Sequence, residues 1–527
     1  MTKTHQYTGF NNPQSWVISR IVQEQAKKHP KRTAIRFING PEWTFAKLRT
    51  EALQTAGWLQ QQGVNTGTRV ALMCDDPVTF CRCWLGLAML GATMVAINTS
   101  VRGEPLRHQL ALAEVSHVIA DPEHLTTVKA CSDKAQVFSS SELTNNTANT
   151  LEESAVHPAK HSDLSCIMFT SGTSGPSKGV LMPEAHCVLF AVGTIENLRL
   201  WGKHTYYICL PLFHANGLHM QLLACLVSGA CAVIRARFSA SNWLSDIRIY
   251  GATHTNMLGA LSAFVVAQPI SELDGEHQLQ VISSAPLPAA TDQALRERFK
   301  VPRVVPLYGM TEVNIPLYGT FDEHAPGTCG RVYERYFAVE IRDPETDEPV
   351  ATGETGEIMV RPKQPWGFMS GYVGMPEKTL EAWRNFWFHT GDAARLDAEG
   401  RFVFVDRIKD CIRRRGENIS SYEVEQAFLA LDGIAEAAAY AVPAGAEGME
   451  DEVMVALEVQ AGTKVDIQSW VEQAAKNLAA FAVPRFVRIV EALPKTPTGK
   501  IRKVVLRNEG ITEDTTETRL THKRAAP

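Results

Sequence analysis

The sequence has no apolar run long enough to cross a bilayer. Its longest apolar stretches, near residues 80–97 and 220–234, contain polar side chains and glycines. They fall short of the roughly 20 apolar residues that a membrane-spanning helix needs. The first residues are polar and lack the apolar core of a secretion signal, and the last three match no carboxy-terminal address. We therefore expect a cytoplasmic protein with no membrane span.

Strong charge of either sign is absent as well. Lys and Arg number 52 against 57 Asp and Glu, which gives a formal net charge of −5. No basic field is therefore available to recruit nucleic acid or an acidic membrane. The expected partners are small molecules, and a homodimer is an assembly that the sequence leaves open.

The cysteines lack the spacing of a disulfide framework or of a metal site. The 11 cysteines are scattered and many stand in apolar context, which is typical of reduced, buried cysteines in a cytosolic protein. The one close pair, Cys81 and Cys83, has no second pair and no histidine cluster nearby. We expect no metal ion that is held by the protein alone.

The pattern of the 527 residues predicts an α/β fold of more than one domain. Strand and helix patterns alternate over residues 15–307, which is typical of parallel sheets covered by helices. Short strands and turns then predict a β subdomain over residues 330–405. The large N-terminal domain, residues 1–408, thus contains two βαβ-type subdomains and this β subdomain. A small α+β domain follows at 409–527, with a disordered tail from about residue 508.

A loop rich in Ser, Thr and Gly follows an apolar strand pattern at residues 166–169. Glycines let the backbone approach a ligand closely, and N–H groups, hydroxyls and the lysine at 178 match phosphate oxygens. A solvated linker is the alternative, but a linker needs neither the strand nor the lysine. The loop is not a Walker loop, because Ser177 precedes Lys178 and Gly179 follows it. We interpret it as a phosphate-binding loop outside the ordinary kinase and GTPase classes.

Three further segments contain side chains that could bind a nucleotide, and each also has an ordinary structural explanation. Residues 307–312 form a strand and a turn with an aromatic ring, a hydroxyl and a carboxylate, or simply a turn with a helix cap at Thr311. Asp392 follows a glycine and suits ribose hydroxyls, although turn aspartates are common. Residues 493–503 form a basic loop, which alone could be a solvated charge run.

The order of these segments is informative. The loop at 170, Tyr308–Glu312, His389–Asp392, Asp406–Asp410 and the Lys500 loop together resemble the adenylate-forming superfamily over residues 15–505. Within it the chain is most similar to acyl-CoA synthetases, and residues 413–420 resemble carnitine/crotonobetaine-CoA ligases. The resemblance implies a two-step ligase: a carboxylate attacks the α-phosphate of ATP to form acyl-AMP and pyrophosphate, and coenzyme A then displaces AMP.

The resemblance also implies roles for single residues. By this resemblance, the residues that bind the β- and γ-phosphates are Thr170, Ser171, Gly172, Thr173, Ser174, Gly175 and Lys178. Those that bind the adenine are Ser284, Ala285, Pro286, Tyr308 and Gly309, and those that bind the ribose are Asp392 and Arg407. The catalytic candidates are Thr311 at the α-phosphate, Glu312 with Mg²⁺ (which Thr170 also serves), His214 beside the acyl pocket, and Lys500 between carboxylate and α-phosphate. The C-terminal domain would turn between the two steps about Lys409 and bring Gly416 to the coenzyme A tunnel.

The chain departs from the family pattern in two places. The loop usually reads Thr-Ser-Gly-Thr-Thr-Gly-x-Pro-Lys-Gly, whereas here Pro176 and Ser177 stand in swapped order and Ser174 replaces a threonine. The adenine strip usually has two glycines where Ser283 and Ser284 stand. These departures put the rigidity of the loop and the fit around adenine in question.

The acid itself is the least defined part of this prediction. Several pocket candidates are polar, which favours a small or polar acid over a long fatty acid; they are His214, Asn216, His254, Gly259, Val313 and Asn314. Two other functions stay open. One is a stand-alone adenylation enzyme that loads a carrier protein, against which residues 415–418 favour coenzyme A. The other is a non-catalytic nucleotide-binding protein, against which the retained charged residues of the motifs argue.

Overall fold

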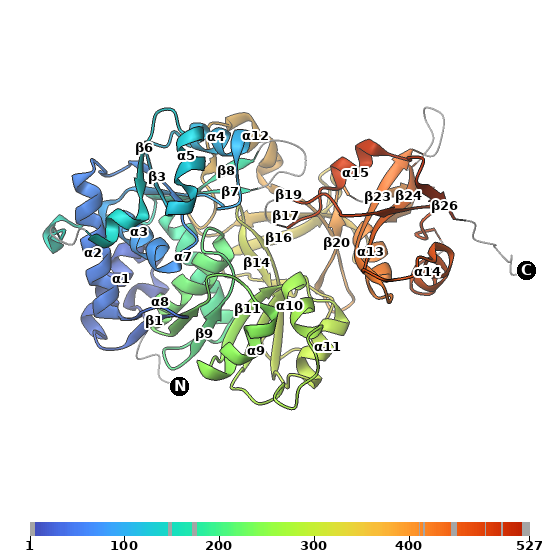
Figure 1. Cartoon of the computed structure of the whole chain (residues 1–527), viewed down its shortest axis with the longest axis horizontal. Coiled ribbons are helices and arrows are strands. Elements are labelled where there is room, and N and C mark those ends of the chain that lie inside the picture. The colour runs from blue at the N-terminus through green and yellow to red at the C-terminus, as the bar shows by residue number, and fades with distance from the viewer. Residues whose placement is uncertain are drawn as a thin grey trace, which may run out of the picture.

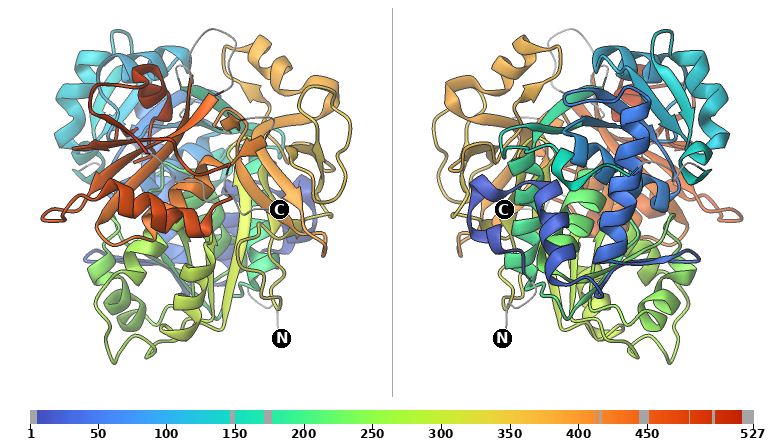
Figure 2. Two further views of the ribbon diagram at one scale, coloured as in Figure 1. Left: turned by 90° about the vertical axis from the view of Figure 1, so that its right-hand side faces the viewer. Right: turned by 90° about the vertical axis from the view of Figure 1, so that its left-hand side faces the viewer.

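The computed structural model describes residues 6–145, 150–170, 177–410, 412–414, 417–443, 451–479, 481–496 and 499–518. A large N-terminal α/β part is followed by a smaller α+β part at one end of the molecule (Figure 1). In the left view of Figure 2, this C-terminal part lies in front of the N-terminal sheets. The predicted fold class is confirmed. No helix within the described ranges is long and apolar enough to cross a membrane.

The first sheet of the N-terminal part has seven strands in the order β18-β8-β7-β4-β3-β5-β6. All of its neighbouring strands are parallel except β7–β8 and β8–β18, which are antiparallel. The β7–β8 hairpin brackets the predicted phosphate loop. The strands are β3 (Arg69–Met73), β4 (Thr93–Ala96), β5 (His117–Ala120), β6 (Gln136–Ser139), β7 (Leu164–Thr170), β8 (Lys178–Pro183) and β18 (Gly371–Tyr372). The helices are α2 (Phe45–Gln61), α3 (Pro77–Leu90), α4 (Gly103–Leu112), α5 (Leu125–Cys131) and α6 (Ser140–Asn145).

The second sheet has nine strands in the order β15-β14-β13-β12-β11-β9-β10-β1-β2. Its centre is parallel, and β2, β14 and β15 add antiparallel edges. The strands are β1 (Thr33–Phe37), β2 (Glu42–Thr44), β9 (Thr205–Ile208), β10 (Cys231–Ile234), β11 (His254–Leu258), β12 (Val281–Ala285), β13 (Arg303–Met310), β14 (Asn314–Tyr318) and β15 (Arg331–Val332). The helices are α1 (Ile18–Lys28), α7 (Glu184–Leu198), π-helix η5 (Asn216–Leu223), α8 (Ala224–Ser228), α9 (Ala240–Ile249), α10 (Gly259–Val266) and α11 (Ala289–Glu297).

Helix α7 is buried on nearly all sides, and it anchors the core between the two sheets. Nearly all of its residues are buried and most of them are apolar, as expected for a helix with little solvent-facing surface. It packs against both η5 and α8 and joins the largest hydrophobic cluster, to which β4, β7 and β9 also contribute. This helix therefore fixes the ends of β7 and β13 relative to each other, which positions the site described below.

A four-stranded antiparallel sheet, β16-β17-β19-β20, lies in the stretch where a β subdomain was predicted. Its strands are β16 (Phe337–Arg342), β17 (Gly356–Pro362), β19 (Phe388–Leu396) and β20 (Phe402–Arg407), and α12 (Pro376–Ala382) precedes β19. Asp406, at the end of β20, accepts the backbone N–H of Ser421 at 2.6 Å. Ser421 is the first residue of α13, so Asp406 holds the C-terminal part to the sheet and does not point to a ligand.

The C-terminal part is built on the sheet β23-β24-β25-β26 and a small hairpin, β21–β22. Its elements are β21 (Ile412–Arg414), β22 (Glu417–Ile419), α13 (Ser421–Leu429), β23 (Ile434–Pro443), β24 (Asp451–Val459), α14 (Ile467–Ala474), β25 (Phe486–Val490), α15 (Lys503–Glu509) and β26 (Thr515–Glu517). The prediction of a disordered tail from residue 508 is wrong as far as Thr518. β26 pairs with β25, and Arg488 binds Asp514 at 3.0 Å and Glu509 at 2.6 Å.

Candidate active site

The candidate site lies where segments far apart in the sequence come together. The Thr170 hydroxyl, at the end of β7, donates to Glu312 Oε1 at 3.3 Å, just beyond the end of β13. Tyr308 Oη, on β13, donates to Asp392 Oδ2 on β19 at 2.7 Å. Ligands of α/β sheets bind beyond the carboxyl ends of such strands. These two hydrogen bonds therefore join three of the five predicted motifs.

Asp392 is a buried carboxylate with two partners on neighbouring strands. Its exposed fraction is 4%. Besides the Tyr308 hydroxyl, it faces Arg407 Nε, at the end of β20, at 3.4 Å. Burial raises the pKa of Asp392, whereas the charge of Arg407 and the hydrogen bond from Tyr308 lower it. Tyr308 thus orients the carboxylate that is predicted to bind ribose, a role in addition to the predicted stacking on adenine.

Glu312 is a second buried carboxylate, and hydroxyls surround it. Thr170 and Tyr372 donate to the same oxygen, Oε1, at 3.3 and 3.2 Å. The ammonium of Lys178 lies 4.1 Å from the centre of the Tyr372 ring. Burial lowers the pKa of Lys178, and the charge of Glu312 opposes that effect. A buried carboxylate flanked by two hydroxyls fits a Mg²⁺ ion, which prefers oxygen ligands and few of them from protein.

Lys500 reaches this group from the C-terminal part. It follows Gly499, whose φ of +79° makes the tight turn, and Thr496 accepts the Lys500 N–H at 3.1 Å. The residue is solvent-exposed, yet its ammonium faces the N-terminal part, where protein displaces some of its water. That desolvation, followed by the charge of Arg407, lowers the pKa of Lys500. The negative charges of Asp392 and Glu312 oppose this shift, which indicates that the Lys500 ammonium lies near both carboxylates.

His214 lies close enough to Lys500 to be affected by its charge. Burial, and then the positive charge of Lys500, lower the pKa of His214 to about 4. Its ring packs edge-on against Phe213 with the ring centres 4.7 Å apart. The imidazole is therefore neutral at physiological pH. It can serve as an uncharged wall or hydrogen-bonding group, and it cannot supply a second cation.

The two serines of the adenine strip turn their hydroxyls into the protein. Ser283 Oγ donates to the Val305 carbonyl at 2.9 Å, and Ser284 Oγ shares a hydrogen bond of 3.0 Å with Ser262 of α10. Both side chains are fully buried. The two serines that replace the family's glycines therefore bond to β13 and α10 inside the protein. At Gly309, by contrast, there is no room for a side chain, because a Cβ there would lie 2.3 Å from the Asn314 carbonyl.

His186 supports the site and was missed by the sequence analysis. It is fully buried in α7, and its Nε2–H donates to the Thr311 carbonyl at 2.8 Å. Asn314 Nδ2 donates to the His186 carbonyl at 2.9 Å, at a backbone φ of 71°. Burial lowers the pKa of His186 to about 4, so this donor stays neutral. Asn314, a predicted pocket residue, therefore braces the Thr311 turn.

The other pocket candidates divide into two groups. Asn216 Nδ2 donates to Asn256 Oδ1 at 3.1 Å, and Gln221 Nε2 donates to Asn216 Oδ1 at 2.9 Å. These amides form a polar network at the start of η5, two residues from His214. His254 differs, since its two ring nitrogens bond to the Thr253 hydroxyl at 2.9 Å and to the Leu198 carbonyl at 3.0 Å. His254 is a core histidine. Val313 and Gly259 are buried, and a Cβ at Gly259 would lie 2.6 Å from the Pro286 carbonyl.

Six predicted site residues lie outside the described residues. They are Ser171, Gly172, Thr173, Ser174, Gly175 and Gly416. Lys409, the predicted hinge, lies near enough to Lys178 that its charge lowers the Lys178 pKa. Its neighbour Asp410 pairs with Arg507 of α15 at 3.1 Å. The hinge segment is thus linked to the C-terminal part on one side and faces the phosphate-loop lysine on the other.

Two family patterns match the chain. The AMP-binding enzyme pattern covers residues 22–373, and the AMP-binding enzyme C-terminal domain covers residues 423–500. The first match includes Thr170, Lys178, Tyr308 and Glu312. The second ends on Lys500.

Similar proteins include several ligases. The chain is 30% identical to a feruloyl-CoA synthase of Streptomyces sp, covering 93% of this chain and 97% of that protein. It is 29% identical to the crotonobetaine/carnitine–CoA ligase of Salmonella typhi, covering 88% and 92% of the two chains. The structure of ATP-bound MatB from Rhodopseudomonas palustris matches with a TM-score of 0.85 at 25% identity, covering 94% of this chain and 99% of that one.

Proposed function

The chain belongs to the AMP-binding enzyme family, and on that premise we propose that it joins a small or polar carboxylic acid to coenzyme A. The enzyme is an ATP-dependent acid–CoA ligase. In the first step the acid and ATP form acyl-AMP and pyrophosphate, and in the second step coenzyme A takes the acyl group and AMP leaves. One observation carries the assignment of residues: Lys500 of the C-terminal part lies among Asp392, Arg407 and Glu312 of the N-terminal part.

The geometry suits the first of the two steps. The nucleophile is an ionised carboxylate, so it needs no general base, but two anions must approach each other. Positive charge placed where negative charge develops is then the main source of catalysis. Lys500 and Lys178 would supply that charge, since the carboxylate of Glu312 acts electrostatically on both. We propose that this arrangement, with Lys500 close to Asp392 and Glu312, is the one in which adenylation takes place.

Magnesium would bind at Glu312, with the Thr170 hydroxyl beside it. One buried carboxylate with hydroxyl neighbours leaves room for phosphate oxygens and water in the coordination shell. The ion would neutralise phosphate charge. Asp392 and Arg407 would hold the ribose, and Tyr308 would contact the adenine.

The amide network next to His214 supports a small or polar acid. Gln221 is fully buried, and its Oε1 has no hydrogen-bond partner within the described residues. Asn216 is only partly buried and donates to Asn256. A long alkyl chain beside this network would leave Gln221 Oε1 unpaired, which is costly in a buried place, whereas a hydrogen-bond donor on a polar acid could pair with it. We further propose that the enzyme is cytoplasmic, since the ten cysteines of the described residues are all free.

Pyrophosphate release, measured with a panel of acids with and without coenzyme A, tests this function. We expect release with short or polar acids, and acyl-CoA only when coenzyme A is present. Release without any thioester would favour an enzyme that loads a carrier protein. No release with any acid would favour a non-catalytic nucleotide-binding protein. Light scattering of the purified chain tests the homodimer.

Replacing Tyr308 by phenylalanine should raise the KM for ATP about 10-fold and leave kcat nearly unchanged. The change removes the 2.7 Å hydrogen bond to the buried Asp392 carboxylate and keeps the aromatic ring. A hydrogen bond to a charged group contributes about 1.5–3 kcal/mol. Steady-state kinetics of pyrophosphate release at varied ATP gives both constants. A fall in kcat with unchanged KM would contradict the positioning role.

The alkaline limb of the pH profile should belong to Lys500. Because its pKa is lowered, Lys500 loses its proton at a lower pH than an ordinary lysine, whose pKa is about 10.4. The value of kcat/KM for pyrophosphate release, which reports the free enzyme, should therefore decline on the alkaline side below that pH. Lys500→Arg keeps its charge throughout, so its profile should lack this limb. An unchanged limb in that variant would assign it to another group.

A further inference from the structure

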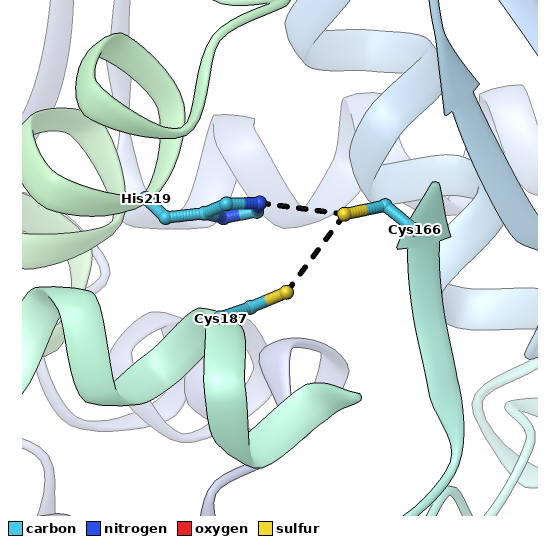
Figure 3. Close-up of side chains that lie close together, drawn as sticks. All are labelled: Cys166, Cys187 and His219. Atoms are coloured by element: carbon cyan, nitrogen blue, oxygen red, sulfur yellow. Dashed lines mark hydrogen bonds between the residues drawn. The ribbon is translucent and has the colours of Figure 1, made fainter. Parts of the chain in front are cut away.

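Three side chains of types that can ligate a metal ion lie close together in the protein core (Figure 3). Cys166 stands on β7, Cys187 on α7 and His219 on η5, and each is fully buried. Cys166 Sγ lies 3.9 Å from Cys187 Sγ and 3.5 Å from His219 Nε2. We propose that these three residues bind a zinc ion that has a structural role.

The separations match those of a tetrahedral zinc site. Zn–S bonds of about 2.3 Å and Zn–N bonds of about 2.0–2.1 Å place two sulfur donors about 3.8 Å apart, and a sulfur and a nitrogen about 3.5 Å apart. The observed 3.9 and 3.5 Å agree with these values, and all three donor atoms lie within 4.8 Å of one another. An ion can therefore bind between them with little rearrangement of the backbone.

The charge balance of the cluster favours a divalent ion. Two thiolates and a neutral imidazole compensate Zn²⁺ completely, which matters in a place without access to water. With Cu⁺ the same ligands would leave a buried negative charge. A fourth, uncharged donor is at hand in Met182, whose Sδ lies 3.7 Å from Cys166 Sγ. The closed surroundings are typical of a structural and not of a catalytic zinc site.

The histidine of the cluster presents a ring nitrogen to the first cysteine. Nε2 of His219 faces Cys166, and its Nδ1 has no hydrogen-bond partner within the described residues. Zinc would displace the thiol protons, as coordinating metals do.

Such an ion would join the three elements that support the ligase site. β7 leads into Thr170, α7 carries His186 against the Thr311 carbonyl, and η5 begins at Asn216. Cys187 and His219 follow Cys166 by 21 and 53 residues, a spacing unlike that of known zinc motifs. The inference opposes the sequence-based expectation of no protein-held metal, and it does not rest on the proposed function.

Metal analysis of the full-length chain tests the site, with Cys187→Ser as the variant. Cys225→Ser is the matched control, since Cys225 is also fully buried but lies on α8 outside the cluster. We expect about one zinc per chain in the wild type and the control, and close to none in Cys187→Ser. A strong chelator should lower the melting temperature of the first two proteins and leave that of the variant unchanged.

Cadmium gives a second measurement that does not depend on the variant folding. Cd²⁺ added to zinc-stripped wild-type protein should produce thiolate-to-metal charge-transfer absorption that saturates at one equivalent, with release of protons. Absence of both zinc and this absorption would overturn the proposal. So would a disulfide between Cys166 and Cys187 in the isolated protein, or equal cadmium binding by well-folded Cys187→Ser.

Discussion

Replacing Lys500 by alanine should slow acyl-adenylate formation by about 10²–10³-fold, as expected for the loss of one group that stabilises developing charge. The same variant should convert supplied acyl-adenylate and coenzyme A to acyl-CoA at nearly the wild-type rate. Lys500 lies among Asp392, Glu312 and Arg407 in this arrangement, where the α-phosphate would be attacked. The second step requires a different residue set, because the C-terminal domain is predicted to turn between the steps.

Two assays separate these outcomes. Pyrophosphate release reports the first step, and thioester formation from chemically prepared acyl-adenylate reports the second. Lys495→Ala is the matched control, because Lys495 stands on the same loop but pairs with Glu436 of β23 at 2.5 Å. The control should retain both activities. Equal loss of both steps in Lys500→Ala would mean that the lysine supports the fold of the loop and not adenylation.

The sequence analysis identified those site residues that stand within a recognisable short motif. Thr170 ends β7 and Glu312 follows the end of β13, whereas Tyr308 lies within β13 and Asp392 in the middle of β19. The structure brings these four residues into contact. Strand ends are visible in sequence as the point where an apolar run meets glycine and hydroxyl residues. The five motifs in this order resemble the adenylate-forming superfamily, and that resemblance implied the reaction.

The residues that sequence reasoning missed act across the fold. Tyr372 comes from the two-residue strand β18, and its hydroxyl reaches Glu312 only because β18 pairs with β8. His186 looks like one more residue of an apolar helix, and nothing in its neighbours indicates the bond to Thr311. Contacts of this kind depend on tertiary packing, and a single sequence carries no local signal for them.

Two errors of the sequence analysis have the same physical origin. The polar residues after Asn508 suggested a disordered tail, but their charges pair with Arg485, directly before β25, and with Arg488 on β25. His254 suggested a substrate contact, but the Leu198 carbonyl and the Thr253 hydroxyl satisfy both of its nitrogens. Polarity alone does not distinguish a solvated group from one that has partners inside the protein.

Replacing Glu312 by glutamine should lower the rate of pyrophosphate release about 10²-fold at limiting Mg²⁺, and added Mg²⁺ should restore part of it. Glutamine keeps a side-chain oxygen that can accept from Thr170 and Tyr372, so the surrounding packing is preserved. It removes the negative charge that would attract the ion. The measurement is the initial rate over a magnesium titration at fixed ATP.

Glu381→Gln controls for a general loss of negative charge. The charge of Glu381 also acts on Lys178, but the residue is exposed and pairs with Lys378 at 2.6 Å. This control should follow the wild-type magnesium curve. If Glu312→Gln lost activity equally at all Mg²⁺ concentrations, the carboxylate would act through Lys178 and Lys500 and not through a metal ion. If both variants lost activity alike, the effect would come from the electrostatic field of the whole cleft, and the buried position of Glu312 would have no special role.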